Sequence, residues 1–138
     1  MDWKECLNKK VVKNVKRDED MIHSLIKSSK NKLESENKLV MSDITASSKL
    51  SLAYDSLREL LEALAFKNGY KIYNHECYTA FLKEIMGESD KGDEFDEIRK
   101  IRNDVNYYGK DISAEEAEDI IKRIKNLRIF VSNLFGQG

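Results

Sequence analysis

The densest group of polar side chains that could do chemistry lies at the end of a predicted helix, over residues 98–109 (IRKIRNDVNYYG). At about 100° per residue, Arg102 and Asn106 lie only about 40° apart, beside the apolar seam of this helix. Arg102 is therefore expected at the edge of the buried stripe. Together with Arg99 and Lys100 it forms a local basic cluster, on which attraction for a nucleic-acid phosphate would depend.

A carboxylate partner would give Arg102 a structural role instead. Arginines at the edge of a core are usually paired with an acid. Asp55 and Glu59 lie one turn apart on the most strongly patterned helix. Paired carboxylates can share a proton, but as partners for Arg58 or Arg102 they would lock neighbouring helices together. The sequence leaves open whether residues 98–109 bind a ligand or hold the fold.

Apolar residues at steps of three and four predict two long helices before this segment. Asp18 can cap the first, whose stripe fades through the polar run 28–37. Ser42 or Asp43 caps the second, and Gly69 ends it because glycine readily adopts the left-handed conformation. The stripes are Met21, Ile22, Leu25, Ile26 and Leu33 in the first helix, and Leu50, Ala53, Tyr54, Leu57, Leu60, Leu61 and Leu64 in the second.

Three more helices are predicted to follow. Asn74 caps the third, which ends at Gly87. A polar loop over residues 88–92 leads to Asp93, which caps the fourth, and a capping box at Ser113 begins the last. The expected inward side chains are Tyr78, Phe81, Leu82, Ile85 and Met86, then Phe95, Ile98, Ile101 and Val105, and finally Ala117, Ile120, Ile121, Ile124, Leu127, Val131 and Leu134.

Composition favours a single helical domain. The chain has 138 residues, no proline, and 24 lysines and arginines against 25 acids, for a net charge of -1. At roughly 150 residues per domain, this length favours one core. Connections of about four to eight residues favour antiparallel neighbours. We expect one all-α domain over 1–138, with a four- to five-helix up-and-down antiparallel bundle over 18–135 and an N-terminal strap over 1–17.

The N-terminal strap differs in character from the bundle. Trp3, Cys6 and Leu7 favour a short helix, and the basic, β-branched stretch after them favours an extended segment. A basic run this short fits a solvated surface and could also bind phosphate. Its cations are Lys9, Lys10, Lys13, Lys16 and Arg17.

Cysteine, histidine and motif content excludes several classes of protein. Cys6 and Cys77 make neither a disulfide framework nor a metal knuckle, so we expect unpaired cysteines in a reducing cytoplasm. His23 and His75 lack ligand spacing and no glycine-rich phosphate loop occurs, so neither a metal nor a cofactor is expected. No apolar run approaches the roughly 18 residues of a spanning helix, and no export signal is recognised, so no membrane contact is expected.

The segment around Arg102 resembles the HEPN superfamily, a group of small four- to five-helix bundles related to prokaryotic toxins and to partners of nucleotidyltransferases. The specific part is Arg102-Asn103, a polar and aromatic helix end, then Tyr108-Gly109-Lys110 and the capped last helix. A weaker similarity is Asn68-Gly69-Tyr70-Lys71 leading to His75-Glu76-Cys77, which resembles the glycine turn and histidine before the third helix of many members. The resemblance covers helix order and length from about residue 18 to residue 135.

In ribonuclease members the motif is an arginine, four to six residues of which the first is usually polar, and a histidine; two protomers join their motifs across a dimer cleft. The resemblance implies that Arg102 binds phosphate as a planar charged fork. It also implies that Asn103 orients the phosphate or contacts the RNA backbone. The family's histidine acts as general acid or base on the ribose 2′-hydroxyl without a metal. Further candidates for ligand contacts are Arg99, Lys100, Asn106, Tyr108 and His75.

This chain departs from the motif at the histidine. Tyr107 stands at the expected spacing, and no histidine follows Arg102. A phenol with an ordinary pKa of about 10 is a poor base at pH 7, whereas an imidazole at about 6.5 is well matched. We therefore predict a degenerate ribonuclease motif. Partner-regulated members carry a modified tyrosine two residues after the histidine, and because Gly109 occupies that position here, no modified tyrosine is predicted.

Three functions are weighed. The first, on the resemblance, is an RNA- or nucleotide-binding module that forms a homodimer and works with a nucleotidyltransferase in a toxin–antitoxin or defence-type system. The second is an active metal-independent endoribonuclease that uses Tyr107 or His75 in place of the missing histidine. The third is a purely structural helical interaction protein in which Arg102 only forms an ion pair. The first follows most directly from a retained Arg102-Asn103 with tyrosine replacing histidine.

Overall fold

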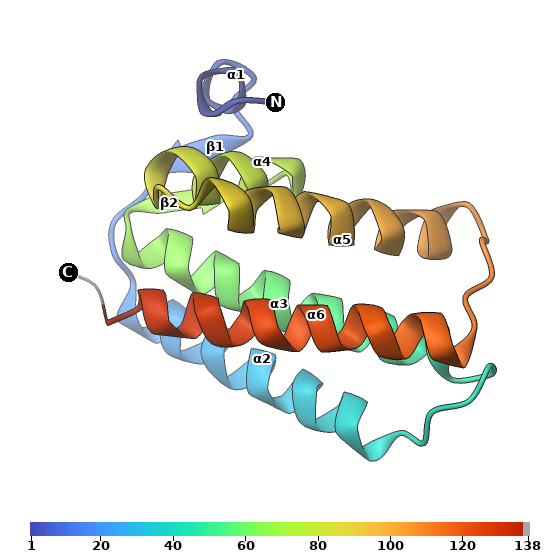
Figure 1. The fold of residues 1–138 in the computed structure, drawn as a ribbon. Helices are drawn as coiled ribbons and strands as arrows, with labels where there is room; N and C mark the ends of the chain where they lie inside the picture. The colour runs from blue at the N-terminus through green and yellow to red at the C-terminus, as the bar shows by residue number, and fades with distance from the viewer. Residues whose placement is uncertain (137–138) are drawn as a thin grey trace.

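The computed structural model describes residues 1–136 and places most of them in helices. The elements are α1 (Trp3–Asn8), β1 (Val12–Asn14), α2 (Glu19–Lys38), α3 (Ala46–Lys67), β2 (Tyr70–Ile72), α4 (Glu76–Ala80), the π-helical turn η1 (Phe81–Ile85), α5 (Ser89–Tyr107) and α6 (Ala114–Leu134). The long helices α2, α3, α5 and α6 run alternately back and forth, which confirms the all-α, up-and-down architecture (Figure 1). Residues 137–138 of the predicted domain lie outside the described part. Among residues 1–136, no helix combines the length and apolar character needed to cross a membrane.

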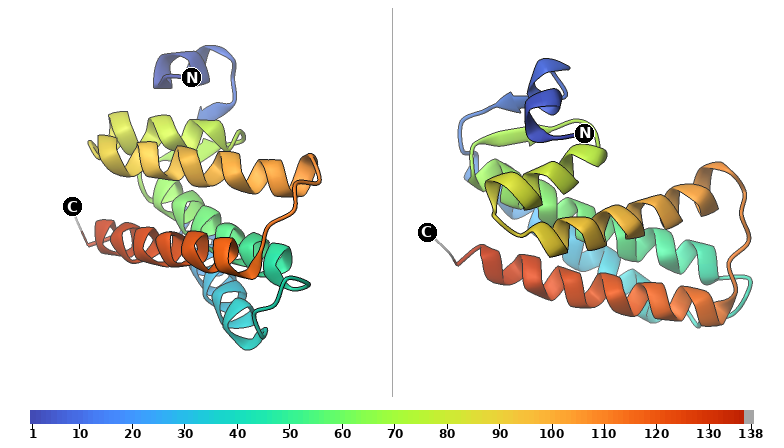
Figure 2. Two further views of the ribbon diagram at one scale, coloured as in Figure 1. Left: turned by 45° about the vertical axis from the view of Figure 1, so that its right-hand side comes forward. Right: turned by 45° about the horizontal axis from the view of Figure 1, so that its top comes forward.

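Helix α3 is the central element of the bundle. Most of its 22 residues are buried, including every member of its predicted apolar stripe. Helices α2 and α6 cover one side of α3, and α5 lies on another, as the views in Figure 2 show. Because α3 is covered on several sides, it presents polar side chains to its neighbours as well as apolar ones.

Helices α2 and α3 approach each other closely through two serines. The hydroxyl of Ser29 donates to the backbone carbonyl of Ser56 (2.6 Å), and the hydroxyl of Ser56 donates to the carbonyl of Ser29 (2.7 Å). Arg128 of α6 donates from Nε to the Ser56 hydroxyl (2.9 Å) and from Nη2 to the Ser29 hydroxyl (3.1 Å). The polar run 28–37 is therefore helical, and it buries Ser29 and Glu36 where an apolar stripe would otherwise continue.

The N-terminal strap is more ordered than a simple extended segment. After α1, the strand β1 pairs antiparallel with β2, with Val12 opposite Ile72 and Lys13 opposite Lys71. Gly69 takes a φ of +87° at the end of α3 and turns the chain toward β1. Three-residue strands are too short to show a period of two in the sequence, so this ribbon was not predicted.

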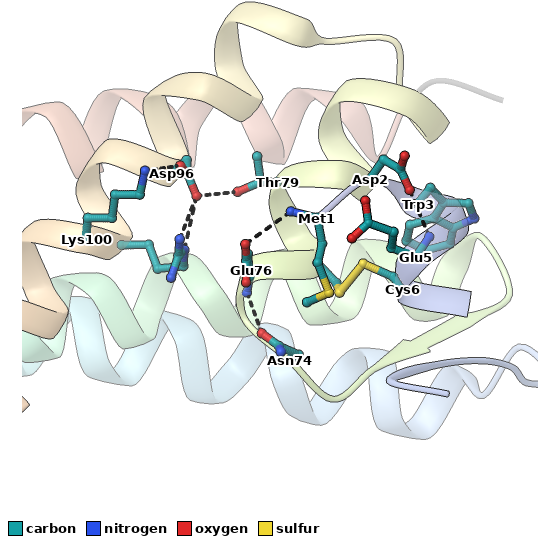
Figure 3. A network of polar contacts seen from close by, with 12 residues as sticks. Met1, Asp2, Trp3, Glu5, Cys6, Asn74, Glu76, Thr79, Asp96 and Lys100 are labelled. Atoms are coloured by element: carbon teal, nitrogen blue, oxygen red, sulfur yellow. Dashed lines mark hydrogen bonds and ion pairs between the residues drawn. A yellow bond between two sulfur atoms is a disulfide. The ribbon is translucent and has the colours of Figure 1, made fainter. Parts of the chain in front are cut away.

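Cys6 of α1 and Cys77 of α4 form a disulfide, so the expectation of unpaired cysteines is wrong (Figure 3). The two residues are 71 positions apart, and the fold brings their Cα atoms to 6.1 Å, within the range of a disulfide. Cys77 is also fully buried, as expected of a small core residue.

Helix α5 begins about one turn earlier than predicted. Residues 88–92 were expected to form a loop ended by a cap at Asp93, but the helix begins at Ser89. A Cβ added to Gly92 would overlap the Cγ of Lys83 and lie 3.0 Å from a carbonyl oxygen of α4. The glycine that suggested a loop instead allows two helices to approach closely.

The third predicted helix changes its winding partway. Asn74 accepts a hydrogen bond from the backbone N–H of Glu76 (2.9 Å), in keeping with its predicted capping role. The helix then widens into η1, and the extra residue per turn displaces the expected inward positions. Ile85 is exposed, so the inward placement predicted for it is wrong, whereas Met86 is half-buried and packs against the core.

Helix α3 lacks the cap predicted for it. Its N-cap is Thr45, without a side-chain capping bond, and Ser42 bonds with Thr45 in the preceding turn. Asp43 instead accepts a hydrogen bond from the first backbone N–H of α6 (2.8 Å). The caps predicted at Asp18 and Ser113 are confirmed, the latter as a complete capping box.

Candidate functional site

The guanidinium of Arg102, near the end of α5, lies between two tyrosine rings. Its central carbon is 4.9 Å from the ring centroid of Tyr54 and 5.5 Å from that of Tyr107. Its Nη1 donates a hydrogen bond to the hydroxyl of Tyr107 (3.1 Å). Tyr54 is fully buried, whereas Tyr107 is 68% exposed. Tyr107 therefore covers the guanidinium on its solvent side.

Of the two carboxylates predicted as partners of Arg102, Asp55 of α3 is the one beside it, whereas Glu59 pairs with Lys32 and Arg58. Nη2 of Arg102 lies 3.6 Å from Oδ1 of Asp55, which is longer than the roughly 2.7–2.9 Å of a good charged hydrogen bond. Nε of Arg102 is buried and has no hydrogen-bond partner within residues 1–136. Because buried N–H groups are almost always bonded, this guanidinium keeps unused capacity to donate.

His75 joins the same cluster through Tyr54. Its Nδ1 lies 3.2 Å from the Tyr54 hydroxyl. Burial, followed by the positive charges of three arginines, lowers the pKa of His75 to about 4. Burial also raises the pKa of Tyr54 to about 12. At neutral pH a protonated phenol therefore faces a neutral imidazole, to which it can donate a hydrogen bond.

Two further arginines flank the cluster, and each has its own acid. Arg58 of α3 lies 3.2 Å from Glu62. Arg99 lies 2.8 Å from an oxygen of Asp96. Lys100 lies 3.0 Å from the other oxygen, a contact visible in Figure 3. Burial alone would raise the pKa of Asp96, but hydrogen bonds from Arg99 and Lys100 lower it overall. Arg99 and Lys100, both predicted to contact a ligand, are therefore already paired with an acid of the same helix.

The other predicted residues are not gathered around the guanidinium. Asn106 accepts a hydrogen bond from the hydroxyl of Ser51 (3.0 Å), which ties the end of α5 to α3. Asn103 is half-buried, and its side chain makes no hydrogen bond within the described residues. Tyr108 is 80% exposed. Lys100 is also exposed, so neither side chain belongs to the buried part of the site.

One cluster thus unites three of the predicted residues, Arg102, Tyr107 and His75, and its centre was missed. Tyr54 was predicted only as a core residue; it is buried as expected, but it also contacts both Arg102 and His75. The sequence did contain one signal for Tyr54. It lies one helical turn before Arg58, and residues four apart share a helix face, so Tyr54 shares its face with a charged residue.

A large cleft of the described chain lies elsewhere. It measures about 670 Å³ and lies between the end of α2, the start of α3 and α6. Lys49 in its wall donates to the backbone carbonyls of Glu36 and Leu39 (2.6 Å each) and so satisfies the end of α2. None of the predicted site residues lines this cleft. Across residues 1–136, no three histidine, cysteine or acidic side chains gather closely enough to hold a metal ion.

Comparisons of the chain with protein-family models, with curated proteins and with solved structures found no match. The interpretation of the cluster therefore depends on the geometry of its own residues.

Proposed function

We propose that this chain is an HEPN-like RNA- or nucleotide-binding module in which Arg102 contacts a phosphate of the ligand. The observation that carries this proposal is the state of the guanidinium. It is held between Tyr54 and Tyr107, its ion pair is long, and its Nε has no partner in the described chain. A planar fork of donors with free capacity suits a phosphate.

Binding begins at Tyr107 in this proposal. The Tyr107 hydroxyl occupies Nη1 of Arg102 in the free chain, and the ring is largely exposed. A phosphate oxygen can therefore replace the hydroxyl without any movement in the core. Asp55 and Tyr54 act as positioning residues that keep the guanidinium in place. Because the net charge is only -1, affinity depends on local contacts and falls as salt rises.

The test is a titration of labelled oligouridylate RNA, followed by fluorescence anisotropy. We expect Arg102→Ala to raise Kd about tenfold, the effect of losing one charge-assisted contact. Arg123→Ala is the matched control, because Arg123 also forms an ion pair with a carboxylate, at 2.8 Å, but on α6. Equal Kd values for wild type and Arg102→Ala, with helical circular dichroism intact, would contradict the proposal.

An active metal-independent endoribonuclease is the second candidate, favoured by His75. His75 is neutral at pH 7 and can accept a proton from a 2′-hydroxyl, but its lowered pKa of about 4 makes it a weaker base than an ordinary imidazole. It is connected to Arg102 through Tyr54. Incubation of the RNA with protein in EDTA distinguishes the candidates. Cleavage that His75→Gln abolishes would support this second function. Tyr107→His is the gain-of-activity control, because it restores the motif histidine.

The third candidate, a structural interaction protein, is favoured by the Arg102–Asp55 pair. Under that function the wild-type chain has no measurable affinity for RNA, and Arg102→Met changes only the free energy of unfolding. The same titration therefore separates all three candidates.

We further propose a second copy of the chain and a nucleotidyltransferase as partners. The support is the resemblance of Arg102-Asn103 and of the helix order to HEPN proteins. Light scattering in solution should give twice the chain mass of 16.0 kDa. A monomeric mass at micromolar concentration would count against the homodimer.

A further inference from the structure

The two-stranded ribbon of β1 and β2 carries like charges at directly opposed positions. Lys13 pairs with Lys71 in the register, while Val12 and Ile72, on the other face, are buried. Like charges directly opposite each other destabilise an antiparallel pair. Neither lysine forms an ion pair with a carboxylate of residues 1–136. The fold therefore maintains a repulsive arrangement that no carboxylate of the described chain compensates.

The chain next to the ribbon adds further positive charge. Between Leu7 and Asp18 the sequence contains five cations and no acid. Of these, Arg17 pairs with Glu19, whereas the other four form no ion pair within the described chain. The unpaired group is Lys9, Lys10, Lys13 and Lys16, and Lys71 joins it across the ribbon. We call these five residues the lysine ribbon.

Tyr73 lies among these charges immediately after β2. The Nζ atoms of Lys13 and Lys71 lie 5.6 Å and 5.1 Å from its ring centroid. Tyr73 is 52% exposed. An exposed ring between lysines is the combination that binds single-stranded nucleic acid, since phosphates contact the lysines and a base stacks on the ring.

We propose that the lysine ribbon and Tyr73 bind the backbone of a single-stranded nucleic acid and stack one of its bases. Charge complementarity identifies a polyanion as the occupant, and the ring requires an unpaired base. An anionic membrane fits less well, because Val12 and Ile72 are buried and Val11 and Val15 are half-buried, leaving little apolar surface to insert.

This inference rests on the proposed function in naming nucleic acid as the ligand, and it extends the contact surface beyond Arg102. Tyr73 is two residues before His75, which belongs to the Arg102 cluster. A strand stacked on Tyr73 can therefore continue along the start of α4 toward that cluster. The two contacts use different residues, so each can be removed separately.

The test is anisotropy titration of a labelled oligouridylate of about twelve nucleotides at several salt concentrations. Lys13→Gln combined with Lys71→Gln should raise Kd about tenfold at low salt and reduce the salt slope by about 1.4, which corresponds to two lost phosphate contacts on a single strand. Tyr73→Ala should raise Kd about fivefold or more, and Tyr73→Phe should restore most of the affinity because a phenyl ring still stacks.

The matched control is Lys27→Gln with Lys30→Gln, which removes the same charge from exposed positions on α2. An equal loss of affinity in this control, or less than a twofold change in the ribbon variant, overturns the proposal. So does binding to phosphatidylserine vesicles that the ribbon variant loses while its RNA affinity is unchanged. The ribbon variant relieves repulsion between an exposed and a half-buried lysine, so we expect it to fold, which circular dichroism checks.

A parallel titration of Arg102→Ala separates this proposal from the proposed function. If Kd rises only in Arg102→Ala, the lysine-ribbon proposal is overturned and the Arg102 contact is supported. If Kd rises only in the ribbon variant, the reverse holds.

Discussion

Arg128 and Arg102 approach α3 from different sides, and their surroundings differ in kind. Arg128 donates to the hydroxyls of Ser29 and Ser56, without any carboxylate, in the contact of α2, α3 and α6. Burial lowers its pKa. Arg102, on the α5 side, contacts two tyrosine rings and one distant carboxylate, and its Nε is left over. The first arginine bonds within a packed layer, whereas the second leaves one buried N–H donor without a partner in the described chain.

The two sides of α3 also differ in the interactions that hold the neighbouring elements together. On the α2 side, short hydrogen bonds between serines bring two helices into close contact. On the other side, the N-terminal segment, α4 and α5 are connected by a disulfide, a short ribbon and side-chain contacts. We infer that packing dominates stability on the first side and cross-linking on the second, and three substitutions test this difference.

The largest effect is expected for Cys6→Ser combined with Cys77→Ser. A loop closed over 71 positions restricts the unfolded chain, and losing it should lower the free energy of unfolding by about 4 kcal/mol in the chain-entropy model. Urea denaturation followed by circular dichroism measures the change. A reducing agent should shift the wild-type midpoint and leave that of the double variant unchanged. A wild-type midpoint that does not change on complete reduction would contradict the inference that cross-linking dominates stability on this side of α3.

A smaller loss is expected for Ser56→Val. This change removes the bonds of the Ser56 hydroxyl with Ser29 and Arg128 and adds methyl groups at the closest contact of α2 with α3. We expect a loss of about 3 kcal/mol in thermal or urea unfolding. Ser51→Val is the matched control on the same helix, because within residues 1–136 the Ser51 hydroxyl bonds only Asn106, on the α5 side. It should cost less than about 1 kcal/mol, and similar losses for both variants would contradict the comparison.

The smallest effect is a pH dependence that belongs to the α5 side alone. The pKa of His75 falls from 6.5 to about 4 on folding, so the unfolded chain takes up this proton first as pH decreases. The stabilising contribution is complete above pH 6.5 and is lost between pH 6.5 and pH 4. Because His75 is only half-buried, we expect about 1–2 kcal/mol after screening by solvent.

Thermal unfolding at several pH values, compared between wild type and His75→Gln, isolates this contribution. Glutamine does not titrate, so the stability difference between the two chains should change across that interval and be constant above it. Parallel pH profiles would show that His75 is not held neutral by its surroundings.

The helices of the α2 side were largely predictable, because their signals are local. Apolar steps of three and four place α3 and α6, and Asp18 and Ser113 cap their helices as the sequence predicts. These patterns depend on helix geometry within one segment. The early start of α5 was missed because Gly92 was interpreted by its turn preference, and its close approach to η1 depends on a second helix.

At the candidate site, features with a local signal were likewise predictable, and other contacts between distant segments were not. The position of Arg102 at the edge of the core and its partner Asp55 follow from helical spacing and charge. The contact of Tyr54 with His75 could not be predicted, because it joins α3 to the start of α4 across the core. The pairing of Lys13 with Lys71 likewise depends on a strand register that only the folded chain sets.

The Cys6–Cys77 bond also makes a closed covalent ring that contains all of α2, α3 and β2. A backbone cut in the exposed stretch between α2 and α3, where Val40 and Ile44 are 82% and 90% exposed, opens the ring without dividing the molecule. A cut between α5 and α6 lies outside the ring and leaves two chains that only non-covalent contacts hold together. Proteolytic nicks in the two connections therefore have different results. The fragments of the first stay covalently joined until the disulfide is reduced, whereas those of the second are not joined.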